Sequence, residues 1–502
     1  MWFRSARVAL GTLTVVSGFA IACARPPRLA ADLVVTHAAI WTGSRSQPAA
    51  TAVAIIGDRI VDVGAADEIE RWRGANTTVL DADGRRVVPG FNDAHVHLLD
   101  GGRRLDDVDL KDAGTRAEFA RRINERAKTK PGEWIVGGDW DEQQWTPPAL
   151  PTRDLIDDIT NSSPVFVVRR DGRMALANAA ALGRAGITEG TADPPGGTIV
   201  RGANGFPTGV LEGAAMDAVV RVIPAMTPEQ RLHAVRRALE HVASLGITSV
   251  QDVNTAYDDI SAYADLANRG ELTARISTAP GETGWYDQAK IGVHRAFGSD
   301  WLRIGTVRAK VDGVGDVIEK RTRLMAADHA GLQVFVDATG DGPASHALDL
   351  FDDIVRANGG RDRRFRVDAS HLAAADLDRL ASLDAIASLA PHAAGMALKP
   401  LIEKRIRVSL GSGWPAAPLN PMVTIGAAIA RGLTAGEALS AYTSGSAFAE
   451  FQETQKGTLA RGMLADLVIL SGDILAIPAE RIKDVQVLTT IAGGKIVHQR
   501  KP

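Results

Sequence analysis

The stretch Val87-Val-Pro-Gly-Phe-Asn-Asp-Ala-His-Val-His-Leu-Leu-Asp-Gly101 decides how this chain folds. An apolar run ends at Pro89-Gly90, and His95 and His97 follow two residues apart. Because side chains alternate between the faces of a strand, this spacing points both imidazoles to the same side. Two neutral imidazoles on one rigid element are half of a zinc-type site. The alternative is two polar residues on a half-exposed strand.

Length and composition predict a soluble globular protein with a large core. The chain has 502 residues, more than one ordinary domain, with 45% hydrophobic and 23% charged residues. The formal net charge of −3 argues against a nucleic-acid or anionic-membrane surface. The expected partner is a small-molecule substrate.

The first residues indicate export. Arg4 and Arg7 precede an apolar run at 8–22 that is short for a membrane span, so residues 1–22 are predicted to be a signal peptide. Cys23, the only cysteine, follows Ala-Ile-Ala as at a bacterial lipoprotein cleavage site. We expect a periplasmic protein or a lipoprotein anchored to the membrane through Cys23. Plain signal cleavage before Cys23 is the alternative.

The two ends of the mature chain predict one composite β-sandwich. Residues 32–88 and 457–502 both contain short apolar strands separated by glycine-containing turns. Neither segment has enough strand to bury a sheet face alone, so together they would close one small sandwich.

Between them, residues 89–456 predict an α/β barrel. Helical stretches such as 228–243 and 344–357 separate several β-rich runs, and such alternation favours a parallel barrel. Residues from about 131 to 215 do not fit a barrel unit and are predicted to be an insertion. The β-rich runs are 247–253, 274–278, 307–311, 332–336, 366–368, 386–389 and 406–410.

These motifs resemble a known family. Pro-Gly-Phe-x-Asp-x-His-x-His is similar to the first barrel strand of the amidohydrolase superfamily of metal hydrolases, and Ala465-Asp-Leu-Val-Ile-Leu470 resembles the family's composite sandwich. The insertion, with Trp134-Ile-Val-Gly-Gly-Asp-Trp-Asp141, resembles the amidohydrolase 3-type subgroup that contains N-substituted formamide deformylase. The resemblance covers about 32–500. It implies a (β/α)₈ TIM-like barrel, an inserted cap over the site and the composite sandwich.

The resemblance also implies a pocket of two histidines, a lysine, two further histidines and an aspartate. His95 and His97 match the first pair. At the other four positions this chain has Arg308, Asp337, Ala369 and Gly413. The last change removes the aspartate that resembles a general base for metal-bound water.

Two readings of this site follow. In the first, His95, His97 and Asp337 hold one divalent metal, expected to be zinc, and Asp337 and Arg308 are the catalytic candidates. In the second, a buried Arg308–Asp337 ion pair stands in for a lost metal, since a guanidinium stays charged and pairs with carboxylates. The candidate substrate-binding residues are Trp140, Arg173, His392 and Trp414.

The predicted function is that of an exported amidohydrolase-type hydrolase acting on a non-peptide C–N bond of a small molecule. The alternative is a metal-poor barrel that performs non-hydrolytic acid–base chemistry or only binds a small molecule.

Overall fold

The computed structural model describes residues 29–160, 163–338, 344–369, 371–392 and 395–500. The expected signal peptide and Cys23 lie outside these residues. In the part of the chain that is described, no helix is long and apolar enough to cross a membrane.

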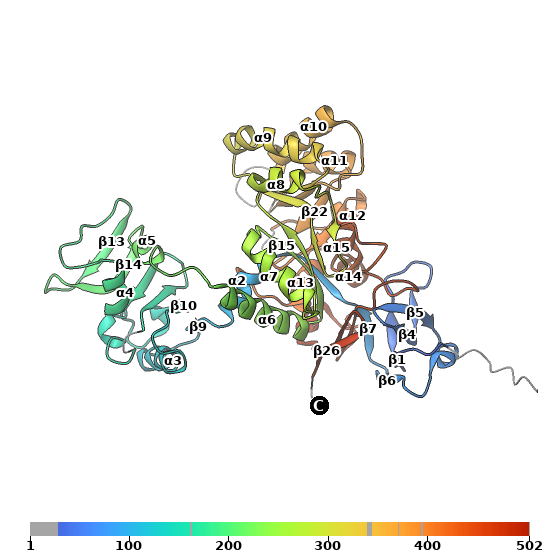
Figure 1. Cartoon of the computed structure of the whole chain (residues 1–502), viewed down its shortest axis with the longest axis horizontal. Helices are drawn as coiled ribbons and strands as arrows, with labels where there is room; N and C mark the ends of the chain where they lie inside the picture. Colours follow the sequence, from blue (N-terminus) through green and yellow to red (C-terminus); the bar gives the residue numbers. More distant parts are fainter. Residues whose placement is uncertain (1–28, 161–162, 339–343, 370, 393–394, 501–502) are drawn as a thin grey trace, which may run out of the picture.

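A parallel barrel occupies the centre of the molecule (Figure 1). Two sheets form it, and isolated bridges join them, Val96 to Trp414 on one side and Gly281 to Arg308 on the other. The (β/α)₈ prediction is confirmed, and each strand lies within two residues of its predicted run. The barrel strands among the described residues are β8 (Phe91–Val96), β15 (Ile247–Val253), β16 (Arg275–Ala279), β19 (Thr306–Lys310), β20 (Gln333–Ala338), β21 (Arg366–Ala369), β22 (Ile386–Leu389) and β23 (Arg407–Leu410).

Helices cover the outside of the barrel. In α6 (Pro228–Ser244), Thr227 and Gln230 form a capping box and Pro228 takes the first turn, so the start is well defined. Its buried face packs in the main apolar core with outward residues of the strands, such as Val250 and Val334. The other helices of this layer are α2 (Leu98–Arg104), α7 (Tyr257–Asn268), α8 (Trp285–Lys290), α9 (Val314–His329), α10 (Ala344–Asn358), α11 (Ala374–Ser382), α12 (Lys399–Glu403), α13 (Pro421–Ala430), α14 (Ala435–Ala441) and α15 (Ser444–Ala449).

Pro89-Gly90 connects the barrel directly to a sandwich strand. A Cβ at Gly90 would lie 2.0 Å from the Thr248 hydroxyl on β15, so only glycine permits this close approach. β7 therefore ends and β8 begins without a loop.

The two ends of the chain build two sheets with a shared core. The first has the order β5 (Arg59–Gly64), β4 (Ala52–Ile56), β1 (Leu33–Thr36), β6 (Thr78–Asp81). The second has the order β26 (Lys495–Gln499), β25 (Val487–Ala492), β24 (Leu467–Leu470), β7 (Arg86–Pro89), β2 (Ala39–Trp41), β3 (Ala49–Ala50). Val53, Val87, Leu467 and Ile491 are buried in the core between them.

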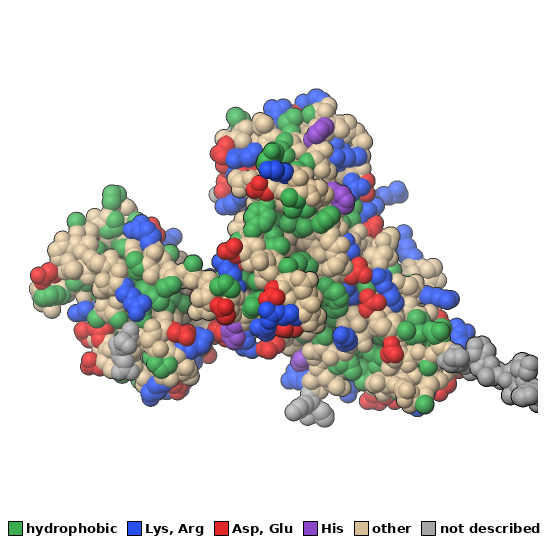
Figure 2. All heavy atoms as spheres, in the orientation of Figure 1, with side chains coloured by type: hydrophobic (Ala, Val, Ile, Leu, Met, Phe, Trp, Pro, Cys, Tyr) green, Lys and Arg blue, Asp and Glu red, His purple; other side chains and the backbone are tan. Residues whose placement is uncertain are grey.

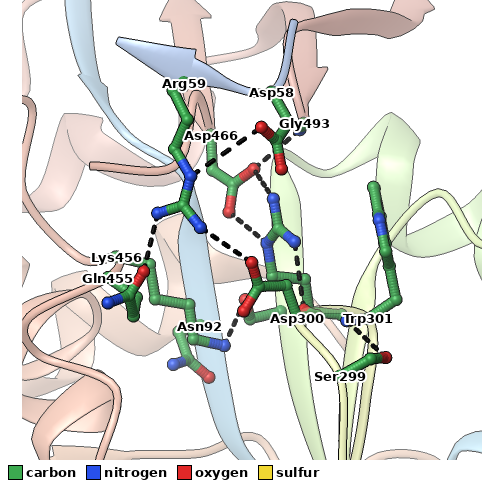
Figure 3. A network of polar contacts seen from close by, with 12 residues as sticks. Asp58, Arg59, Asn92, Ser299, Asp300, Trp301, Gln455, Lys456, Asp466 and Gly493 are labelled. Atoms are coloured by element: carbon green, nitrogen blue, oxygen red, sulfur yellow. Dashed lines mark hydrogen bonds and ion pairs between the residues drawn. The ribbon is translucent and has the colours of Figure 1, made fainter. Parts of the chain in front are cut away.

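A polar network joins the sandwich to the barrel (Figure 3). Asp466 forms an ion pair with Arg275 of β16 at 2.7 Å, and both side chains are almost fully buried. Arg59 of β5 pairs with Asp300 at 2.8 Å and donates to Gln455. The sandwich therefore docks on the barrel through buried charges as well as apolar contacts.

The insertion is a separate small α/β unit beside the barrel (Figures 1 and 2). Its sheet has the order β13 (Gly197–Arg201), β14 (Pro207–Gly213), β12 (Met174–Ala177), β11 (Val165–Arg169), β10 (Ile135–Trp140), β9 (Val108–Asp109). Its helices are α3 (Arg116–Thr129), α4 (Ala179–Arg184) and α5 (Met216–Val220). Because β9 pairs with β10, the unit begins before the expected start near 131.

Candidate functional site

Four charged or titratable side chains gather at the carboxyl ends of the barrel strands, where barrel enzymes carry their sites. They are His95 near the end of β8, Arg308 on β19, Asp337 on β20 and Asp368 on β21. The period of two along β21 turns Asp368 away from the apolar layer that Val367 joins.

His95 and Asp368 form a dyad. The Nδ1 atom of His95 lies 2.5 Å from Oδ2 of Asp368, and their side chains are 12% and 6% exposed. When Nδ1 carries the proton and donates it to this carboxylate, the lone pair of the imidazole lies on Nε2. That tautomer is the one that accepts a proton from water or substrate. Asp368 was absent from the predicted site, although it directly precedes Ala369, one of the four changed positions.

His97 is held in a different way. Its ring donates to the backbone carbonyl of Val253, at the end of β15. Burial is the main cause that lowers the pKa of His97, and the charge of Arg308 lowers it further.

Arg308 and Asp337 form the ion pair that the sequence indicated. Nη2 of Arg308 donates to Oδ2 of Asp337, and these side chains are mostly buried as well. The Arg308 Nε is buried with no hydrogen-bond partner among the described residues. Lys310, which would need a register shift to replace the family lysine, is exposed and pairs with Asp312 at 2.9 Å.

The expected metal set does not fit this arrangement. In the described ranges, no three His, Cys, Asp or Glu side chains are grouped so that they could hold a metal ion. The reason lies at Asp337, whose carboxylate is engaged by the Arg308 guanidinium. A catalytic zinc normally needs three protein ligands. The grouping of His95, His97 and Asp337 as metal ligands is therefore not supported.

Gly413 leaves open space beside the dyad. Its backbone N–H donates to the His95 carbonyl at 2.8 Å, and a Cβ built there would meet no atom within 4 Å. Its φ of +72° is in the left-handed region that glycine adopts without strain. Residue 413 thus lies next to His95 through its backbone hydrogen bond, but it has no carboxylate.

Two predicted substrate contacts are misplaced. Trp140 is fully buried in the core of the insertion, where its N–H donates to the Val167 carbonyl and its ring packs against Phe119. Arg173 is exposed on a turn of the same unit. Neither lies at the barrel strands that carry the dyad, because the insertion stands beside the barrel.

The other two lie near the site. Trp414 packs against Gly101 and the His241 ring, and its carbonyl accepts the His97 N–H at 2.8 Å, so it supports the backbone rather than facing a substrate. The His392 ring donates to the Ser412 carbonyl, and burial lowers the pKa of His392.

Buried carboxyl groups anchor the loops around the histidines. Asp93 accepts from the backbone N–H groups of His95 and Ser412 and from the Tyr442 hydroxyl. Asp252 accepts from the Leu98 N–H at the start of α2. Both carboxyls stand in the barrel strands that the sequence indicated, but only the structure shows what they hold.

Arg366 lies deeper in the barrel than the dyad. Its Nη2 donates to the Ala94 carbonyl and to Ser388, and its guanidinium lies 4.2 Å from the centre of the Phe335 ring. Burial lowers the pKa of Arg366 to about 10. Since Ala94 directly precedes His95, Arg366 fixes the strand that presents the dyad.

Comparisons with known proteins agree with this fold. Residues 78–498 match the amidohydrolase family. Protein LONG AFTER FAR-RED 3 of Arabidopsis thaliana is 33% identical, over 94% of this chain and 92% of its own length. N-substituted formamide deformylase of Arthrobacter pascens is 24% identical over 93% of this chain and 98% of its own.

A solved structure, an uncharacterized metal-dependent hydrolase from Pyrococcus furiosus, superposes with a TM-score of 0.73 at 24% identity, over 88% of this chain and 99% of that one. The barrel, the first-strand histidines and the match over most of the chain lead to one conclusion: this protein belongs to the amidohydrolase family and has the fold of its hydrolases.

Proposed function

We propose that the protein hydrolyses a non-peptide C–N bond of a small molecule, with His95 as the group that transfers the proton. The observation that carries this proposal is the contact of His95 Nδ1 with Asp368 at the carboxyl ends of the barrel strands. A carboxylate that orients an imidazole is a recurrent general-base arrangement.

The proposed reaction balances with these groups alone. Water attacks a carbonyl carbon bonded to nitrogen while its proton passes to Nε2 of His95. The same proton then moves to the leaving nitrogen as the C–N bond breaks, which gives a carboxylic acid and an amine. Arg308 supplies N–H donors to the carbonyl oxygen as negative charge develops there.

The alternative is an acid–base or binding site without hydrolysis. The Arg308–Asp337 pair favours it, because the family's metal position is altered there. A panel of N-formyl amines, amides and ureas, followed by amine release and by calorimetric binding, separates the two. Turnover supports hydrolysis, and binding without release of amine supports the alternative.

For a compound that turns over, His95→Gln and Asp368→Asn are each expected to lower kcat/KM by about 100-fold to 10,000-fold. His37→Gln is the matched control, since His37 is an exposed histidine of the sandwich that pairs with Asp81. Full activity in His95→Gln would contradict the assignment.

A further inference from the structure

We infer that the guanidinium of Arg308 takes the place of a divalent metal ion as the permanent cation of this site. The inference rests on the contacts of Arg308, Asp337 and His97, and it does not depend on the proposed reaction.

The first step is the charge of Arg308. A guanidinium keeps its proton in proteins and matches a carboxylate well. Here it is mostly buried against Asp337, the carboxylate that a metal would need as its third ligand. Binding of a metal by Asp337 would require this ion pair to break inside the barrel.

The charge of Arg308 also acts at the position where a metal ion would bind. The Arg308 guanidinium contacts the Asp337 carboxylate, so an ion bound by that carboxylate would lie within a few ångströms of this positive charge. The same field opposes a doubly charged ion placed between His97 and Asp337. A unit charge about 5 Å from a divalent ion weakens its binding by several powers of ten, even at an effective dielectric constant of about 20.

The third step is the number of free ligands. Asp368 engages one nitrogen of His95 and the Val253 carbonyl engages one nitrogen of His97, so each imidazole keeps its other nitrogen for a metal. The third ligand is lacking, because the Arg308 guanidinium holds the Asp337 carboxylate. Two imidazoles without a third ligand do not make a catalytic zinc site. The fixed cation is thus compatible with the ligand set, whereas a metal is not.

Arg308 can also bind an oxygen of a substrate, as a metal ion would. Its Nε is buried without a hydrogen-bond partner among the described residues, which leaves an N–H for an oxygen of a bound molecule. A carbonyl oxygen or a carboxylate fits this donor. This role, unlike the metal content, rests on the proposed function.

The test is metal content by mass spectrometry of full-length protein purified without chelator, followed by equilibrium dialysis against zinc alone. The unmodified protein is expected to hold well under one metal ion per chain. One zinc per chain that is lost on His97→Gln would overturn the inference.

Two substitutions isolate the charge. Arg308→Gln removes it and breaks the ion pair with Asp337, and zinc binding is expected to tighten by about 100-fold or more. Arg308→Lys keeps the charge and is expected to bind zinc as weakly as the unmodified protein. Circular dichroism checks that both variants are folded.

The gain in zinc affinity of the Arg308→Gln variant must come from this site. Adding His95→Gln should abolish it, whereas adding His233→Gln, a change at an exposed histidine of α6, should not. A folded Arg308→Gln protein without any gain in zinc affinity would overturn the assignment of the cation to Arg308.

Discussion

At the scale of single residues, the site depends on buried ionisable groups whose partners set their charge. Asp252 on β15 accepts from the Leu98 N–H at 2.7 Å and from the Tyr263 hydroxyl at 2.8 Å. Burial is the main cause that raises the pKa of Asp252 to about 7. The folded protein therefore binds a proton here more tightly than the unfolded chain does.

This shift predicts a pH dependence of stability. Between about pH 4 and pH 7 the folded state holds the Asp252 proton that the unfolded chain loses, so this group's contribution to stability falls as pH rises through that window. Asp252→Asn keeps the shape of the side chain but cannot titrate. It should therefore remove this decline in the free energy of unfolding, which is on the order of a few kcal/mol. Denaturation midpoints across the window measure it.

The control is Asp217→Asn, a change at an exposed aspartate in the first turn of α5. It should leave the pH profile of the unmodified protein in place. Parallel profiles for the unmodified protein and Asp252→Asn would show that Asp252 does not carry the dependence.

At the scale of elements, the junction between barrel and sandwich depends on how deeply each ion pair is buried. Asp466, directly before β24, accepts from Arg275 of β16 and from the Gly493 N–H. Asp300 pairs with Arg59 and Arg303 at the same junction but is 30% exposed (Figure 3). Removal of Asp466 leaves a buried arginine without its carboxylate, whereas removal of Asp300 leaves partly exposed arginines. The free-energy cost of the two substitutions should therefore differ.

Asp466→Ala is therefore expected to destabilise the protein by about 3–5 kcal/mol, because the charge of Arg275 stays buried without its carboxylate partner. Asp300→Ala is the matched control and should cost about 1 kcal/mol or less. Urea denaturation of both variants measures the difference. Equal losses would mean that burial does not govern this junction.

At the scale of the whole molecule, the insertion is a unit of its own that a narrow connection joins to the barrel (Figure 2). It buries its apolar residues in two cores of its own, one around Trp140 and one around Leu211. It therefore needs no barrel surface to cover them. Asp106, at the connection, forms a hydrogen bond with His233 of α6, and its carboxylate lies 3.9 Å from the ammonium group of Lys130, which directly follows α3.

We also propose that the protein is exported and lipid-anchored through Cys23. Cys23→Ser should move the protein from the membrane fraction to the soluble fraction without changing its melting temperature, because the residue precedes the folded units. Cell fractionation with labelled fatty acid tests this. Unmodified protein that is soluble and unlabelled would leave only signal cleavage without a lipid.

The sequence by itself determined the barrel and part of the site. Periodicity located the strands, and the His95-x-His97 spacing identified the strand that presents the histidines. It also predicted the Arg308–Asp337 pair, from the two family positions that these residues occupy. In the sheet Asp337 lies opposite Lys310, two residues along from Arg308, so both side chains of the pair are on the same face.

Only the tertiary structure decided what His95 does. Its partner Asp368 is 273 residues away, and Arg366 reaches Ala94 across a similar separation. These contacts join strands that are not neighbours in the sheets, so they depend on barrel closure and on the register of every strand between them. No local pattern encodes that register. The place of the insertion was decided in the same way, by which apolar faces it buries within itself.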